Sequence, residues 1–230
     1  MKFTGGMEIT EVSVQVRSVR GAADFYEGVL GLDVMAGRGS LVVTIGPTRL
    51  TLIEDPETAG DHHFAITIPS NKFTEAKNWI QRRTQLLGTS EADEFECSPV
   101  WNAHSLYFAG PDRSVLEFII RRDLDNATPG PFTSADLLCI SEVGVAVSDV
   151  PAVVESLDIE AAISPYAGTP DSTFAPLGDV HGLVIAVMAG RVWFPTIDRV
   201  ADESPISITA VGQRPGTYSV GTLGSLRIVS

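Results

Sequence analysis

The chain has 230 residues, 44% of them hydrophobic, which is enough apolar material to bury one large core or two small ones. Its net charge of −13 repels phosphate backbones and anionic lipids, so neither nucleic acid nor a membrane surface is an expected partner. No segment approaches the run of roughly 20 apolar residues that spans a bilayer, and a cytoplasmic location is predicted. The two cysteines, Cys97 and Cys139, lack CxxC spacing and are interpreted as isolated thiols.

Three short segments repeat one alternating pattern. They are EVSVQV at 11–16, HFAITI at 63–68 and EVGVAV at 142–147. Successive side chains of a strand point to opposite faces, so the large apolar residues of each segment share a core-facing side. The residues that open the segments, Glu11, His63 and Glu142, lie on the other side. The three segments agree in phase and predict copies of one structural unit.

Helical and strand-like segments follow each copy in the same order. Apolar residues at helical spacing fill 19–34 and 73–88, and 150–157 is a shorter segment of the same kind. Pairs of strand-like segments come next, at 40–46 and 48–55, at 103–110 and 114–120, and at 174–179 and 182–188. The predicted fold class is α+β, built from repeated strand-helix-three-strand modules.

Two segments carry a resemblance to a known family. VSVQVRSVRGAADFYEGVLGLDV, at 12–34, is similar to the opening strand and helix of the vicinal oxygen chelate superfamily, and HSLYFAGPDRSVLEFI, at 104–119, is similar to its closing hairpin. That superfamily includes glyoxalase I, extradiol dioxygenases and bleomycin-binding proteins. The resemblance covers 8–122 and, more weakly, 136–196. It implies that modules pair edge to edge into a curled mixed sheet, a cup that holds a metal ion.

The resemblance also implies metal-ligand positions. The first strand of a unit commonly opens on a ligand His, which here gives His63 in the second unit and Glu11 in the first. The closing strand commonly carries a ligand Glu near its middle, which gives Glu117, whereas Thr51 stands there in the first unit. The implied metal ligands are therefore Glu11, His63 and Glu117. One imidazole and two carboxylates suit one divalent ion, namely iron(II), manganese or zinc.

Strand parity supports a special role for Glu117, whereas His63 and Glu11 can each have a purely structural role. Glu117 lies opposite Leu116 and Phe118 on an apolar strand, where a buried charge needs a cation or a hydrogen-bond partner. His63 can be a hydrogen-bonded residue at a strand end, and Glu11 can cap a strand. A Glu that opens a unit need not be a metal ligand. Glu142 opens the third unit, and that unit has Val184 where a ligand Glu would stand.

Further side chains are candidates for the cup or its rim. Tyr107 and His104 are the candidate catalytic residues, although they lie on opposite faces of one predicted strand. Trp101 and Asn102 are expected at the rim. The segment 189–196 is interpreted as a plug that packs the third unit against the first two. His62 is expected to face solvent, and His181 is expected in a hairpin turn.

The predicted domain organisation follows from a Pro-rich interruption around 129–131. Residues 8–122 are expected to hold paired modules with the metal cup, 123–135 a linker, and 136–230 a third module plus a truncated fourth. The predicted function is a divalent-metal-dependent enzyme, a dioxygenase or lyase acting on a small oxygenated or aromatic molecule. The alternative is metal-free small-molecule binding. A small-molecule substrate and a second copy in a homodimer are the expected partners.

Overall fold

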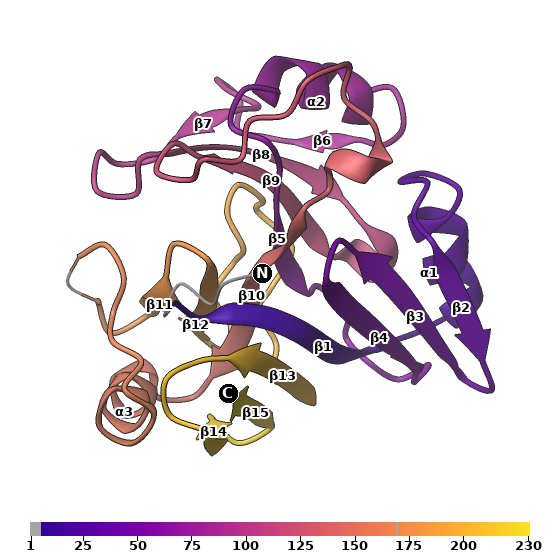
Figure 1. Cartoon of the computed structure of the whole chain (residues 1–230). Helices are drawn as coiled ribbons and strands as arrows, with labels where there is room; N and C mark the ends of the chain where they lie inside the picture. The colour runs from indigo at the N-terminus through magenta and orange to yellow at the C-terminus, as the bar shows by residue number, and fades with distance from the viewer. Residues whose placement is uncertain (1–5, 169) are drawn as a thin grey trace.

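The computed structural model describes residues 6–168 and 170–230, which form two mixed β-sheets and three α-helices (Figure 1). The first module comprises β1 (Glu8–Val16), α1 (Val19–Tyr26), β2 (Val34–Gly37), β3 (Ser40–Ile45) and β4 (Thr48–Glu54). The second comprises β5 (His63–Thr67), α2 (Phe73–Ile80), β6 (Leu86–Leu87), β7 (Phe95–Glu96), β8 (Ala103–Ala109), the 3-10 turn η1 (Pro111–Arg113) and β9 (Val115–Arg121).

The second half of the chain continues the pattern. A 3-10 turn, η2 (Ser134–Asp136), leads into a third module of β10 (Cys139–Val147), α3 (Val150–Ser156), the π-helical turn η3 (Leu157–Ala161), β11 (Phe174–Asp179) and β12 (Gly182–Met188). Three further strands follow with no helix between them: β13 (Ile206–Val211), β14 (Gly216–Val220) and β15 (Gly224–Val229). The expected α+β class is confirmed. Within the described residues, no helix combines the length and apolar character needed to cross a bilayer.

Polar side chains mark where strand becomes helix in the first and third modules. Ser18 accepts a hydrogen bond from the Gly21 N–H at 3.2 Å, and Asp149 accepts one from the Ala152 N–H at 3.0 Å. Each bond satisfies a backbone donor that the first helical turn leaves free, so the side chain ends the extended segment and starts the helix. After α1 the chain turns at Gly31, whose φ of 64° favours glycine.

The modules pair differently from the expectation. The seven-stranded sheet has the order β14-β15-β13-β1-β4-β3-β2, so the first module joins the last three strands through antiparallel β1 and β13. The eight-stranded sheet has the order β11-β12-β10-β5-β9-β8-β6, so the second module joins the third through antiparallel β5 and β10. The prediction that the first two modules share one sheet is therefore wrong. Alternation assigns side chains to faces but does not specify which strand edges pair.

Both sheets therefore combine strands from the two halves of the chain, and residues 8–122 do not complete a cup alone. The segment that connects the halves is anchored on the second module. The buried Lys72 ammonium lies 2.7 Å from the Asp136 carboxylate and donates to the Pro129 carbonyl at 3.2 Å. Domain boundaries at 122 and 136 stay a prediction, but the residues between them pack against the fold.

One hydrophobic core joins the two sheets. Val12 and Val14 of β1 and Val143 and Val145 of β10 all belong to it and are at most 3% exposed. The helices add their apolar faces at its edges, as Tyr26 of α1 does. The predicted core-facing sides of β1, β5 and β10 are confirmed, and the opposite face of each sheet is left for other roles.

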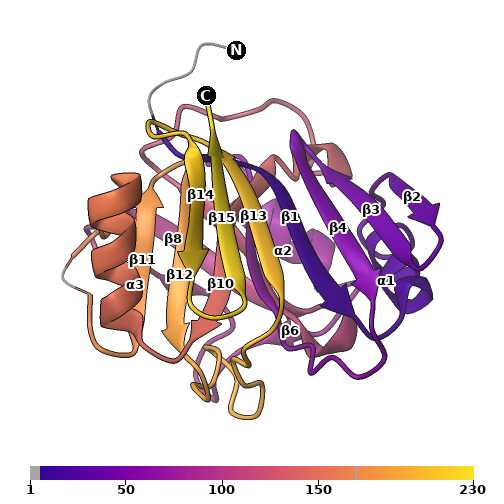
Figure 2. The ribbon, with the colours of Figure 1, turned by 90° about the horizontal axis from the view of Figure 1, so that it is seen from below.

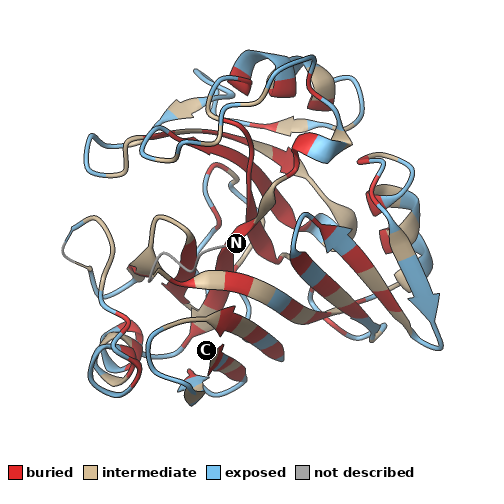
Figure 3. Ribbon diagram, viewed as in Figure 1, coloured by how far each residue is buried: buried red, intermediate tan, exposed pale blue. Residues whose placement is uncertain are grey.

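The two outer faces differ in exposure. Figure 2 shows the strands of the seven-stranded sheet side by side, from β14 to β2, with the other sheet behind them. Buried and accessible residues alternate along its β1, β3 and β4, whereas β5 and β9 of the eight-stranded sheet are buried at every position (Figure 3). Both faces of the eight-stranded sheet are therefore covered near its centre.

Substitutions on the two faces should separate packing from surface roles. Leu116 of β9 is 1% exposed in the core, so Leu116→Ala should lower the free energy of unfolding by about 2 to 5 kcal/mol through the cavity it leaves. Glu11→Ala removes a side chain that is 55% exposed and should change it by about 0.5 kcal/mol or less. Urea denaturation of both variants measures the difference. Equal destabilisation would contradict the assigned faces.

Candidate metal centre and cavity

Strand register brings three potential ligands together on the covered face of the eight-stranded sheet. Strand β5 lies between parallel β9 and antiparallel β10, and its Ala65 is opposite Glu117 on one side and Glu142 on the other. His63 lies two residues earlier on the same face. One ligand atom from each of His63, Glu117 and Glu142 falls within 4.8 Å of the others. The small side chain of Ala65 leaves room for the two carboxylates.

The orientation of His63 is fixed by a backbone contact. Its Nδ1 lies 3.0 Å from the Val115 carbonyl oxygen, which can only accept, so Nδ1 carries the proton. Its Nε2 then presents a lone pair and lies 3.7 Å from Glu117 Oε2. Burial lowers the pKa of His63 to about 4, against a weaker opposing effect of the backbone hydrogen bond. The imidazole is neutral near pH 7, in the form and orientation that a metal ligand requires.

The two carboxylates are buried side by side. Burial raises the pKa of Glu117 well above its usual value, and the neighbouring charge of Glu142 raises it further, while hydrogen bonds from Ser105 and Tyr107 act in the opposite direction. Burial also raises the pKa of Glu142, against the opposing charge of Arg121. The Arg121 guanidinium forms an ion pair with Glu142 through Nη2. In the absence of a cation at the trio, burial and the charge of Glu142 together favour the protonated form of Glu117.

These three residues form part of the wall of a cavity of about 420 Å³. Its aromatic wall consists of Trp101, Tyr107, Phe174, Trp193 and Phe194. Two of these, Trp193 and Phe194, belong to the segment after β12. The Trp193 ring lies 5.2 Å from the His63 ring, and Phe194 packs against Tyr107 at 5.5 Å. The cavity has the size and apolar character of a small-molecule site.

A glycine permits the approach of Trp193. A Cβ on Gly144 of β10 would lie 2.6 Å from the Trp193 ring and 3.0 Å from the His63 Cβ. Any larger residue at 144 would push the indole away from the imidazole. The segment that carries Trp193 is also held by charge, since Arg113 bridges Asp61 at 3.0 Å and Asp198 at 3.1 Å. The close approach at Gly144 and the ion pairs of Arg113 therefore position the segment that carries Trp193.

The structure does not bring Glu11 to the trio, and this corrects the expected ligand set. Glu11 lies on the outer face of the seven-stranded sheet, where its side chain is 55% exposed and pairs with Arg49 at 3.7 Å. Glu142 joins His63 and Glu117 instead. The reason is the module pairing, because β10 and not β1 is the neighbour of β5. Glu142 has the same place in its module as His63 has in its own.

Register also identifies the fourth position of this arrangement. Gly144 pairs with Ile185 in the third module as Ala65 pairs with Glu117 in the second. The residue that matches Glu117 is therefore Ile185, and the expected Val184 lies on the core face. Ile185 lines the cavity and offers no ligand atom. Three of the four positions, His63, Glu117 and Glu142, therefore carry atoms that can coordinate a metal, and the fourth position is apolar.

The two candidate catalytic residues lie on different faces of β8. Tyr107 lies opposite Glu117 and lines the cavity. Burial and then the charge of Glu117 raise the pKa of Tyr107 well above its usual value, so its hydroxyl keeps its proton. His104 lies on the helix side, where it stacks on Phe73 of α2 with ring centroids 3.7 Å apart. A role for His104 in the cavity is therefore wrong, because its strand parity is opposite to that of Tyr107.

The remaining expectations divide. Trp101 lines the cavity, whereas Asn102 donates a hydrogen bond to Asp123 at 2.7 Å and does not line it. His181 lies in the turn between β11 and β12, as expected. His62 is buried, and its Nε2 lies 2.8 Å from the Gln15 carbonyl oxygen, so the solvent-facing assignment is wrong.

Sequence reasoning misses Glu142 as a partner of His63, and it gives no role to Arg121. The phase of EVGVAV marks Glu142, but the wrong module pairing removes its significance. Arg121 continues the parity of Glu117 along β9, which places it on the same face. The segment 189–196, for which packing between the units is the favoured expectation, supplies Trp193 and Phe194 to the cavity.

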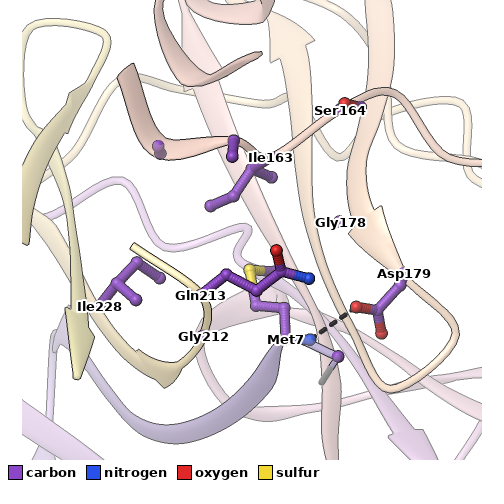
Figure 4. A pocket seen from close by; sticks show the side chains of 11 residues that line it. Met7, Ile163, Ser164, Gly178, Asp179, Gly212, Gln213 and Ile228 are labelled. Atoms are coloured by element: carbon purple, nitrogen blue, oxygen red, sulfur yellow. Dashed lines mark hydrogen bonds between the residues drawn. The ribbon is translucent and has the colours of Figure 1, made fainter. Parts of the chain in front are cut away.

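A second hollow, of about 60 Å³, lies where β1, β11 and the end of β15 meet (Figure 4). Its one acidic side chain, Asp179, accepts a hydrogen bond from the Met7 backbone N–H at 2.6 Å. The neighbouring side chains include Ile163 and Ile228. The hollow is small and its carboxylate is already engaged, so the larger cavity is the candidate site.

Comparisons with known proteins address the fold. No family model matches the sequence, and no curated protein matches it either. Among solved structures, glyoxalase I from Zea mays aligns with 96% of this chain and 92% of its own, at a TM-score of 0.57 and 13% identity. A candidate dioxygenase from Bacillus subtilis aligns with 98% of this chain and 86% of its own, at a TM-score of 0.60 and 13% identity. The chain has the glyoxalase/dioxygenase fold.

The raised pKa of Glu117 predicts a pH dependence in metal-free protein. A carboxyl whose pKa is raised on folding stabilises the fold below its ordinary value of 4.5 and loses that contribution as pH rises through the folded pKa. Glu117→Gln stays neutral, so its free energy of unfolding should rise relative to the parent from about pH 4.5 upward, by at most about 1.4 kcal/mol per pH unit.

Urea denaturation in EDTA between pH 4 and 8 measures this difference. Glu11→Gln is the matched control, because it removes an exposed carboxylate and should stay within about 0.5 kcal/mol of the parent. A difference between Glu117→Gln and the parent that does not change with pH would show that Glu117 is ionised and compensated without a metal.

Proposed function

We propose that this protein is a divalent-metal-dependent enzyme that acts on a small oxygenated or aromatic molecule in the cavity beside His63, Glu117 and Glu142. The single observation that carries the proposal is the convergence of three buried ligand atoms within 4.8 Å at the cavity wall. The fold agrees with this function but does not define it, because one fold hosts many chemistries.

The donor set fits a divalent ion. The ring of His63 is neutral and fixed through Nδ1, which leaves Nε2 free to coordinate. Glu117 is 3% exposed. Among the described residues, the one basic side chain within 4.0 Å of its carboxylate is His63, whose imidazole is neutral and brings no charge. A buried carboxylate beside a second carboxylate is strongly disfavoured unless a cation or a proton compensates it. One nitrogen and two carboxylate ligands suit iron(II), manganese or zinc.

His63, Glu117 and Glu142 would hold the ion, which would supply Lewis-acid chemistry toward an oxygen of the substrate or, with iron(II) or manganese, activation of dioxygen. The residues of the chain bind and orient the substrate. Tyr107 keeps its hydroxyl proton and donates a hydrogen bond to Glu117, which holds that carboxylate in place at the cavity wall. Trp193 and Phe194 add an aromatic wall against which a ring of the substrate can pack. Apolar Ile185 leaves the fourth side of the trio free of protein ligands.

Metal-free binding of a small molecule is the second candidate function, and one observation favours it. Arg121 already neutralises Glu142, so a single proton on Glu117 would balance the remaining charge of the trio. The aromatic walls would then act as a binding surface with no chemistry. The two functions differ in metal content and share the same cavity.

Metal content separates the two ligand sets and the two functions. Untagged protein incubated with zinc, manganese or iron(II) and then desalted should retain close to one equivalent of an ion. His63→Ala, Glu117→Gln and Glu142→Gln should each lose most of it, because each removes one ligand. Glu11→Gln should retain as much as the parent. Plasma mass spectrometry measures the metal, and thermal melts confirm that each variant is folded.

Two results would count against the proposal. Loss of metal in Glu11→Gln with retention in Glu142→Gln would contradict the trio found on the eight-stranded sheet. Absence of retained metal from the parent with all three ions, together with binding of aromatic compounds in the cavity, would establish metal-free binding instead.

A further inference from the structure

Buried donors without partners lie in the cavity wall and directly behind it. Among the described residues, four buried side-chain polar atoms make no hydrogen bond. Nε1 of Trp193 belongs to a residue of the cavity wall, and Nε and Nη1 of Arg121 lie behind the wall, where Arg121 pairs with the wall residue Glu142. The fourth atom is Thr58 Oγ1, which lies elsewhere. A buried donor without an acceptor carries a free-energy cost, and such exceptions mark a missing partner. The unmatched groups at the cavity are donors and not acceptors.

Arg121 lies at the inner end of the ligand face. Val115, Glu117, Ile119 and Arg121 share one side of β9, and Glu117 and Ile119 line the cavity. The Arg121 side chain has no exposed surface, and its Nη2 is taken by Glu142. The guanidinium carbon lies 5.8 Å from the Trp101 ring centroid, and Trp101 itself lines the cavity. Arg121 therefore borders the site while two of its nitrogens remain free.

Tyr166 and Trp101 form a cover over this end. The guanidinium carbon lies 5.9 Å from the Tyr166 ring centroid, and the two rings meet edge to face at 5.3 Å. Trp101 comes from the loop before β8 and Tyr166 from the loop before β11, so neither is fixed within a strand. A ligand group can reach Arg121 only if one of these aromatic side chains moves, so binding there includes that movement.

The net charge of the site favours an anionic ligand, as the unpaired hydrogen-bond donors do. The guanidinium of Arg121 contributes one positive charge. With a divalent ion at the trio and both glutamates ionised, the buried charges sum to one net positive charge. The cavity would then carry an excess of positive charge and of hydrogen-bond donors inside aromatic walls. A neutral hydrocarbon would leave both uncompensated, and a cationic ligand would add to the excess.

We propose that the cavity selects small aromatic carboxylates, with the ligand carboxylate accepting hydrogen bonds from Arg121 and its ring packing against Trp193 and Phe194. This inference rests on the proposed function for the role of the cavity, and it adds the chemical class of the ligand. Arg121 acts as a specificity-determining residue, since a hydrogen bond between charged groups is worth more than one between neutral groups.

Benzoate and benzamide are the matched probes, because they share a ring and differ in charge. Isothermal titration calorimetry at fixed ionic strength, with zinc-loaded and with EDTA-treated protein, should show tighter binding of benzoate than of benzamide. Arg121→Met should weaken benzoate binding by about tenfold to a hundredfold and leave benzamide within about twofold. If Arg121→Met does not fold, Arg121→Lys tests the same expectation, because it keeps a charge beside Glu142 and lacks Nε and Nη1.

Arg191→Met is the control for general electrostatics. Arg191 also lines the cavity and lies over the Phe174 ring at 5.1 Å, but it is exposed, so its loss should leave the preference for benzoate in place. The inference is overturned if the parent binds both probes equally or neither, if Arg121 variants keep the preference, or if Arg191→Met abolishes it. Metal content measured on the same samples reports on the proposed function separately. A metal-free parent that still prefers benzoate through Arg121 would refute the metal site and retain the ligand class.

Discussion

The structure depends on the burial of two carboxylates against one strand. Glu117 and Glu142 flank Ala65 of β5 from opposite sides, and both are less than 5% exposed. Two adjacent buried acids cannot both be ionised without compensation. Arg121 compensates Glu142, and the neutral His63 brings no charge to Glu117. One negative charge is left, and a bound divalent ion would turn it into one net positive charge. The burial of both carboxylates strengthens the need for compensation, because charges are less well solvated there than at the surface.

The two sheets show what the same architecture becomes with and without that constraint. By register, the positions on the seven-stranded sheet that match the trio and Ile185 are Glu11, Thr51, Ser207 and Arg227. One of these is an acid, and it pairs with Arg49 in solvent. The outer face of the seven-stranded sheet is accessible to solvent at these positions. On the eight-stranded sheet, Glu117 and Glu142 are buried beside the loops that carry Trp101, Tyr166 and Trp193. The two sheets share the same arrangement of central strands and differ in the side chains on their outer faces.

The sequence predicts the modules well and their pairing poorly. Alternation along β5 and β9 correctly separates Glu117 and His63 from the core residues beside them, and it correctly places Tyr107 on one face of β8. Edge pairing depends on how four modules pack together, and all of the first strands share one alternation. Glu11 and Glu142 are therefore equivalent candidates in the sequence, and the choice of Glu11 is wrong. Arg121 is missed for a related reason. Its role as the ion-pair partner of Glu142 follows only from the pairing of β5 with both β9 and β10.

A crystal of the protein soaked in manganese gives the most direct measurement. Anomalous diffraction locates the ion independently of any assumption about its ligands. The account predicts one strong anomalous peak within about 2.2 Å of His63 Nε2 and of a carboxylate oxygen from each of Glu117 and Glu142. An absence of any peak at the trio at saturating manganese, or a peak beside Glu11 on the seven-stranded sheet, would contradict it.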